Sequence, residues 1–124
     1  MATPDHPADS AAHLKREMAV LTADFATEQA VERLRRAIKL GQTVEIIKCA
    51  NHAATAVKEV ADLVTLPDED ADTSVTVHAN VTGCLNAMTH AEQAGDADGV
   101  LSAAELVGDA VVNYAAFLKN GVPR

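Results

Sequence analysis

Residues 43–66, TVEIIKCANHAATAVKEVADLVTL, form the most regular helical pattern of the chain. Apolar side chains return every three or four positions in two adjacent rows. The first row comprises Ile46, Cys49, Ala53, Ala56, Val60 and Leu63, and the second comprises Ile47, Ala50, Ala54, Val57, Ala61 and Val64. Together the rows make an apolar face broad enough to contact at least two neighbouring helices. The stretch therefore predicts a helix inside a bundle, which Pro67 ends.

The segment before it, residues 10–40, carries a second apolar pattern. Four apolar side chains recur at intervals of four, three and four: Leu14, Met18, Leu21 and Phe25. Three more continue the pattern: Val31, Leu34 and Ile38. The phase slips between Asp24 and Thr27, so two interpretations stay open: one long helix that bends there, or two helices with Thr27 capping the second. Ser10 is the expected N-cap of the first helix, and Gly41 stands where a helix usually ends.

Two further helices are predicted after the acidic turn at residues 67–73. The first covers about residues 74–94 and ends at Gly95. Its core row comprises Val77, Val81, Cys84, Met88 and Ala91, and a row of small residues comprises Ala79, Gly83, Ala87 and Ala91. The second begins at Ser102, which forms a capping box with Glu105. Its apolar stripe comprises Ala103, Val107, Ala110, Tyr114 and Phe117.

These patterns predict an all-α protein, an antiparallel four- to five-helix bundle formed by residues 10–124, with a flexible N-terminal tail at residues 1–9. Aromatic residues make up only 2% of the chain, so Ala, Val, Leu and Ile must fill the core. The helices joined by residues 67–73 should form an antiparallel hairpin, which separates Cys49 from Cys84 by about 10 Å. A disulfide cannot span that distance, so we expect two buried free thiols.

Charge and hydropathy count against several classes of partner. The net charge is −8, which opposes binding to the phosphates of nucleic acid. The longest apolar stretch, residues 100–118, is interrupted by Glu105, Asp109 and Asn113, so we expect no membrane span. The first residues carry charges in place of the apolar core of a signal peptide, and we expect a cytoplasmic protein with reduced cysteines.

Residues 94–105, AGDADGVLSAAE, carry the most specific local motif. Four of them stand at the spacing of calcium ligands: Asp96, Asp98, Ser102 and Glu105. With Gly99 at the sharp turn, the run resembles the loop of the EF-hand family over about a tenth of the chain. The resemblance implies a calcium site, although Ala94 stands where the family has its first ligand. A glycine-rich turn leading into the Ser102 capping box explains the same residues without calcium.

Patterns for catalysis are weak throughout the chain. The serines all stand at predicted helix starts, where capping explains them. Cys49 and His52 lie on different faces of one predicted helix, so they do not converge on a metal. The sequence has no phosphate-binding loop and no dinucleotide fingerprint. We therefore expect neither catalysis nor a cofactor.

The leading hypothesis is a small, soluble, acidic binding or scaffold protein that self-associates as a homodimer. The apolar rows on residues 43–66 and the small-residue row on residues 79–91 exceed what a chain of this length hides alone. Candidate interface or cavity residues are Ile47, Ala50, Ala54, Val57, Ala79, Gly83, Ala87, Met88, Tyr114 and Phe117. One alternative is a binder of a small apolar ligand in a cavity lined by Met88, Tyr114 and Phe117. Another is a calcium-binding protein that uses the EF-hand-like loop.

Overall fold

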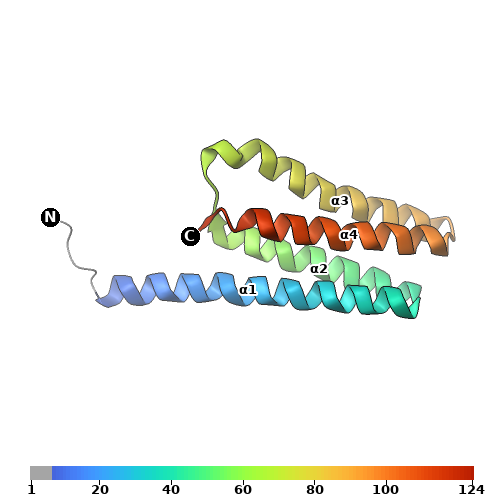
Figure 1. Ribbon diagram of the computed structural model, residues 1–124, viewed down its shortest axis with the longest axis horizontal. Coiled ribbons are helices and arrows are strands. Elements are labelled where there is room, and N and C mark those ends of the chain that lie inside the picture. Colours follow the sequence, from blue (N-terminus) through green and yellow to red (C-terminus); the bar gives the residue numbers. More distant parts are fainter. Residues whose placement is uncertain (1–6) are drawn as a thin grey trace.

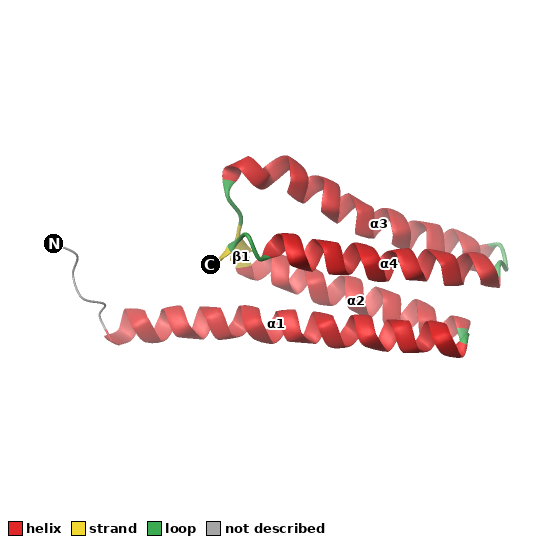
Figure 2. Cartoon of the chain, in the orientation of Figure 1, coloured by secondary structure: helices red, strands yellow, loops and turns green. Residues whose placement is uncertain are grey.

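Within residues 7–124, which the computed structural model describes, the chain forms four α-helices (Figures 1 and 2). They are α1 (Pro7–Leu40), α2 (Thr43–Leu63), α3 (Ala71–Gln93) and α4 (Ala97–Leu118). A 3-10 turn, η1, covers Asp68–Asp70, and two short strands, β1 (Val64–Thr65) and β2 (Val122–Pro123), complete the fold. The prediction of an all-α bundle is confirmed, with four helices.

The N-terminal helix begins earlier than the sequence pattern predicted. Residues 1–6 of the expected tail lie outside the described residues, whereas residues 7–9 already belong to α1. Proline is favourable at the first position of a helix, because its fixed φ fits and its missing N–H would have no helical partner there. Ser10 is therefore inside the helix and is not its N-cap.

Helix α1 is continuous, which decides between the two interpretations of its phase slip. Thr27 does not cap a second helix. Its hydroxyl donates a hydrogen bond to the carbonyl of Ala23 at 2.9 Å, and the residue is buried in the core. A threonine side chain that bonds the preceding turn can sit among apolar neighbours with its polar group satisfied.

The bundle is built around α2 and α4. Helix α1 packs on both of them, whereas α3 packs along α4 and scarcely touches α2. Figure 1 shows the first turns of α3 leaning away from the rest of the bundle. The hairpin predicted across residues 67–73 is therefore wrong in its partners, because the hairpins that form are α1–α2 and α3–α4.

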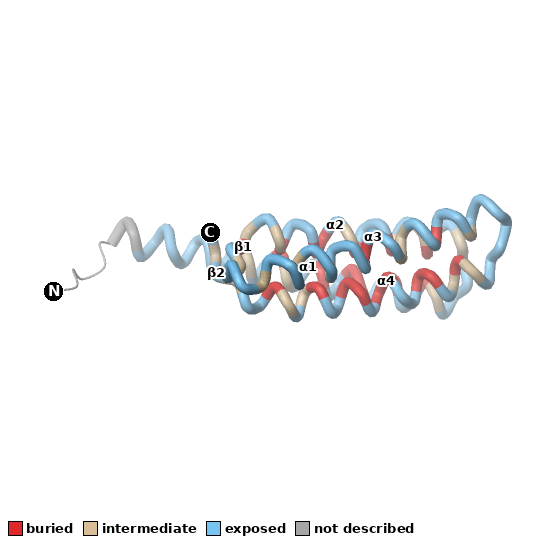
Figure 3. The backbone as a smooth tube through the Cα atoms, turned by 90° about the horizontal axis from the view of Figure 1, so that it is seen from above, coloured by how far each residue is buried: buried red, intermediate tan, exposed pale blue. Residues whose placement is uncertain are grey.

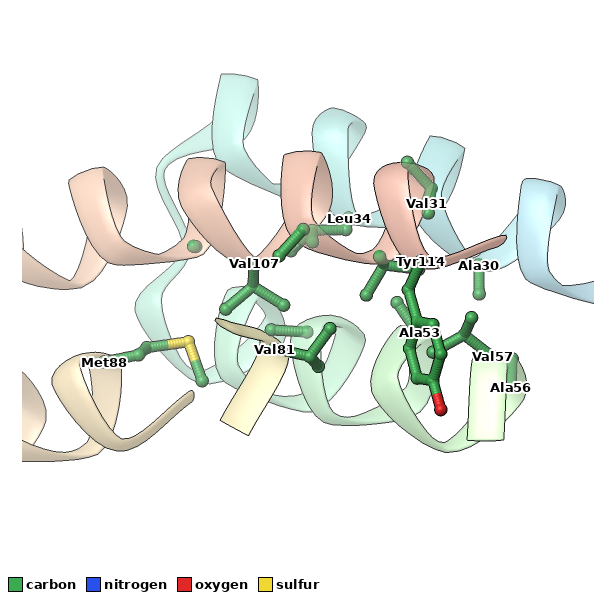
Figure 4. Close-up of a cluster of buried hydrophobic side chains, with 14 of the residues drawn as sticks. Ala30, Val31, Leu34, Ala53, Ala56, Val57, Val81, Met88, Val107 and Tyr114 are labelled. Carbon is green, nitrogen blue, oxygen red and sulfur yellow. The ribbon is translucent and has the colours of Figure 1, made fainter. Parts of the chain in front are cut away.

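The core consists mainly of alanine and valine. The largest fully buried side chains include Leu34, Ile46 and Met88, and Tyr114 is also buried (Figure 4). Every residue of the two apolar rows of α2 is buried or half-buried, because α1 and α4 cover the two sides of that helix. The prediction that this helix contacts two neighbours is confirmed.

Helix α2 ends at Leu63 and not at Pro67 as predicted, because Val64 and Thr65 are extended and pair with residues 122–123. Strands β1 and β2 pair in antiparallel, with Val64 opposite Pro123 and Thr65 opposite Val122. The backbone N–H of Arg124 donates to the carbonyl of Leu63, and its Nε donates to the carbonyl of Val64, each at 3.0 Å. Strands of two residues are too short to show an alternating pattern, so the sequence does not reveal this clamp.

Helix α4 is apolar on almost every side. By length and composition it could cross a membrane, so Glu105 and Asp109 do not exclude a span in the way the sequence suggested. This is weak support for a membrane protein, because the central helix of a bundle passes the same test. Nine residues of α4 are buried between its neighbours, which accounts for its composition without a membrane.

Candidate functional site

The longest regularly spaced series of exposed large apolar side chains in the described part of the chain lies on α1. It consists of four side chains, each more than half exposed: Leu14 (58%), Met18 (54%), Leu21 (61%) and Phe25 (61%). We call these four residues the outer stripe. Scattered exposed apolar residues are ordinary, but four aligned along three turns of one helix are typical of an interaction surface.

The outer stripe points away from the bundle. Each of its residues precedes a buried residue of α1 by nine positions, in the pairs Leu14–Ala23, Met18–Thr27, Leu21–Ala30 and Phe25–Leu34. Nine residues are about two and a half helical turns, so the two members of each pair lie on opposite sides of the helix. Helix α1 therefore carries two apolar stripes with the same spacing, one facing the core and the other facing solvent.

The first half of α1 also extends beyond the other helices. Figure 1 shows it projecting past the ends of α2 and α4, and Figure 3 shows the same segment as exposed. Among the described side chains, the first buried residue of α1 is Ala23. Among the residues that the structure describes, the outer stripe consequently has no partner, either on its own face or around the projecting segment.

Charged residues border the outer stripe. Lys15 and Glu17 lie beside it, and His13 contacts Glu17 across one turn at 2.9 Å. Glu28 and Glu32 follow Phe25 at the next two steps of the same spacing, so the apolar face ends there. An apolar centre with a charged border is the usual composition of a helix–helix contact.

The predicted interface residues fall into three groups. Four are buried in the core: Ala50, Val57, Met88 and Tyr114. Three are half-buried against it: Ile47, Ala54 and Phe117. Three are exposed on α3: Ala79, Gly83 and Ala87. The apolar width of α2 is thus covered within one chain, and it no longer supports self-association.

The three residues predicted to line a cavity differ in their surroundings. Met88 is fully buried in the core, and Phe117 is half-buried against it. Tyr114 instead lines an open groove between α2 and α3. The ring of His78 meets that of Tyr114 edge to face, with 6.1 Å between the centroids. Burial raises the pKa of the Tyr114 phenol, and the nearby Asp62 carboxylate raises it further.

The calcium-ligand candidates lie on a helix start and not around a loop. Asp96 is the N-cap of α4, and its carboxylate accepts a hydrogen bond from the Gly99 N–H at 2.9 Å. Asp98, Ser102 and Glu105 follow along the helix and are exposed. Residues 10–124 contain no group of three or more metal-ligating side chains that could hold an ion. The Ser102 capping box is also wrong, because α4 begins five residues before it.

The two cysteines are free thiols and are half-buried, not fully buried as predicted. Cys49 and His52 line one groove between α1 and α2, together with Arg33 and Lys48. The sequence placed these two side chains on different faces of the helix and did not predict a shared groove. The Cys49 thiol contacts a Glu45 carboxylate oxygen at 3.7 Å. Burial, followed by this carboxylate, raises the pKa of the thiol, so the groove does not activate Cys49 as a nucleophile.

No protein-family model, curated protein or solved structure matches this chain. Function is therefore inferred from the surfaces that the chain itself presents. Among them, the outer stripe combines exposure, regular spacing and a charged border. The groove at Tyr114 and the groove at Cys49 are both lined by mixed polar side chains, such as His78 in the first and Arg33 in the second, but both are open at the surface and enclose no cavity.

Proposed function

We propose that this protein self-associates as a homodimer through the outer stripe of α1, and that it acts as a helical binding or scaffold module. The observation that carries the proposal is the position of the stripe, opposite the core face of the same helix. Burying these side chains against a partner removes apolar surface from water, which is the main favourable term in association.

The spacing of the outer stripe suits a second helix as the partner. Intervals of four, three and four are those of the apolar seam between two helices that pack side by side. The projecting first half of α1 can be approached by another helix without disturbing the bundle (Figure 1). A membrane surface would fit less well, since the chain carries a net charge of −8 and cellular membranes are anionic.

Charge favours a second copy of α1 over contact elsewhere on the molecule. Helix α1 holds six basic and five acidic residues, whereas residues 41–124 hold four basic and twelve acidic ones. Two copies therefore repel each other least where their α1 helices meet. Every copy also brings its own outer stripe, so one contact covers the exposed apolar side chains of both.

The test is the oligomeric state of a variant with a polar outer stripe. We expect the native chain to approach twice its 13.0 kDa mass at micromolar concentration in light scattering coupled to size exclusion. Leu14→Gln with Leu21→Gln should raise the dimer Kd by roughly a hundredfold or more, because each substitution acts twice in a symmetric dimer.

A matched control replaces two apolar residues that are equally exposed but lie off the stripe. Val75→Gln with Leu106→Gln removes side chains that are 70% and 56% exposed on α3 and α4. This variant should keep the native Kd, and both variants should keep native helical content by circular dichroism. A native chain that stays monomeric throughout, or a control that loses the dimer equally, would overturn the proposal.

A further inference from the structure

We infer that the two α1 helices pair in antiparallel, with Leu14 of one copy level with Phe25 of the other and Met18 level with Leu21. This inference rests on the proposed self-association. The spacing of the outer stripe reads the same in both directions, four, three and four, so a reversed copy meets it at every step. The two-fold axis of the dimer then passes between Met18 and Leu21.

The residues that follow the outer stripe decide against a parallel pair. Glu28 and Glu32 continue the same face of α1 beyond Phe25. In a parallel pair each glutamate would face the same glutamate of the other chain in the seam, where two like charges repel and lose water. In the antiparallel pair Glu28 comes level with Ala11. Glu32 comes level with the N-terminal end of the other α1, where the helix dipole favours negative charge.

The bulk of the molecule favours the same orientation. Residues 41–124, which form α2, α3 and α4, carry the excess of acidic side chains. A parallel pair places these two acidic bodies at the same level, whereas an antiparallel pair places them at opposite ends of the joined helices. The bundle covers the face of α1 opposite the outer stripe and leaves the stripe itself open to the other copy's α1. Beyond the stripe, Glu28 and Glu32 border the groove between α1 and α4.

One contact opposes the antiparallel pair. Glu17 and Asp24 lie on the same border of the outer stripe, so each Glu17 comes near Asp24 of the other copy. Glu17 is exposed and Asp24 half-buried, so water screens the repulsion between them. The repulsion between two glutamates in the parallel seam is larger, because less water remains there.

The orientation is tested by disulfide formation between cysteines placed outside the outer stripe. The background is the full chain with Cys49→Ala and Cys84→Ala, which removes the native thiols. Ala11→Cys and Glu28→Cys are made separately in it, and each leaves the four apolar side chains in place. The variants are oxidised alone and as a mixture, and intact mass separates the mixed disulfide from the two self-linked products.

We expect the mixture to form the mixed disulfide roughly tenfold faster than either variant links to itself, since the antiparallel pair brings positions 11 and 28 together. Two copies of position 11 would lie about 25 Å apart along the helices, beyond the reach of a disulfide. Rapid self-linking of both variants would overturn the antiparallel orientation and leave the dimer intact. A dimer that forms none of the three disulfides would overturn pairing through this face.

A background chain that stays monomeric in light scattering is a different result. It would count against the proposed self-association itself, and it would be checked against the native chain at equal concentration. The mass thus tests self-association, and the disulfide pattern separately tests the orientation of the two helices. The orientation is supported only when the dimer is present and the mixed disulfide dominates.

Discussion

At the scale of single residues, Asp96 shows how one hydrogen bond can explain a motif. The EF-hand-like spacing of residues 94–105 is real in the sequence, yet α4 begins at Ala97 and places most of the run on a helix. Gly95 adopts a positive φ of 69°, which ends α3 and turns the chain toward α4. Short acidic and glycine-rich turns supply both helix caps and calcium ligands, so the residue types alone could not distinguish the two uses.

Substitution of Asp96 should therefore change stability without any role for calcium. Asp96→Ala removes the cap of α4 and should lower the free energy of unfolding by about 1 kcal/mol. Asp98→Ala is the control, because Asp98 is exposed in the first turn and makes no cap hydrogen bond. Urea denaturation measures both. A native chain whose midpoint rises in millimolar calcium, with that rise lost in either variant, would contradict this interpretation.

At the scale of elements, α1 shows what periodicity predicts and what it leaves open. The spacing of Leu14, Met18, Leu21 and Phe25 correctly predicted a helix, and the slip near Thr27 correctly located a change of face. It did not predict that the first stripe would stay exposed. A sequence pattern shows that a helix face is apolar, whereas its partner depends on how the other helices pack.

The border of the outer stripe offers a test of orientation by charge. Glu17→Lys should convert the repulsion between Glu17 and Asp24 of the other copy into attraction at two symmetric places. Exposed pairs contribute little each, so we expect the dimer Kd to fall by roughly fivefold. In a parallel pair residue 17 would instead lie near Thr22 of the other copy, and Kd would hardly change.

The measurement is sedimentation across a concentration series at low and high salt. Tightening by Glu17→Lys should fade at high salt, because salt screens exposed charges. Asp24→Lys in combination with Glu17→Lys is the matched control, since it restores like charges across the same contact. A double variant that binds as tightly as the single one would argue against the antiparallel contact.

At the scale of the whole molecule, the choice of helix partners could not be predicted from the sequence. A bundle of four to five helices, the helix ends at Gly41 and Gly95 and the broad face of α2 followed from the spacing of apolar residues. The end of α2 at Leu63, before Pro67, did not. The placement of α3 did not. Its second half carries the buried residues Val81 and Met88, and α4, apolar on nearly every side, offers it more surface than α2 has left.

This arrangement leaves the first half of α3 weakly held. Among residues 71–80 only Ser74 and Val77 are half-buried, and the others are exposed. In the second half of α3, by contrast, Val81 and Met88 are buried. Weak tertiary packing lets a helix segment open locally without global unfolding. We therefore expect backbone amides of residues 75–80 to exchange with deuterium at least roughly tenfold faster than those of residues 84–90.

A variant within α3 separates local opening from looseness of the whole bundle. Gly83 is exposed, and a Cβ there would meet nothing within 4 Å, so Gly83→Ala should strengthen the helix by about 1 kcal/mol. It should slow exchange in α3 while leaving α2 unchanged. Gly99→Ala is the control, because a Cβ there would collide with the Asp96 carboxylate and disturb the cap of α4. Equal exchange rates along α3 would show that α4 holds its whole length firmly.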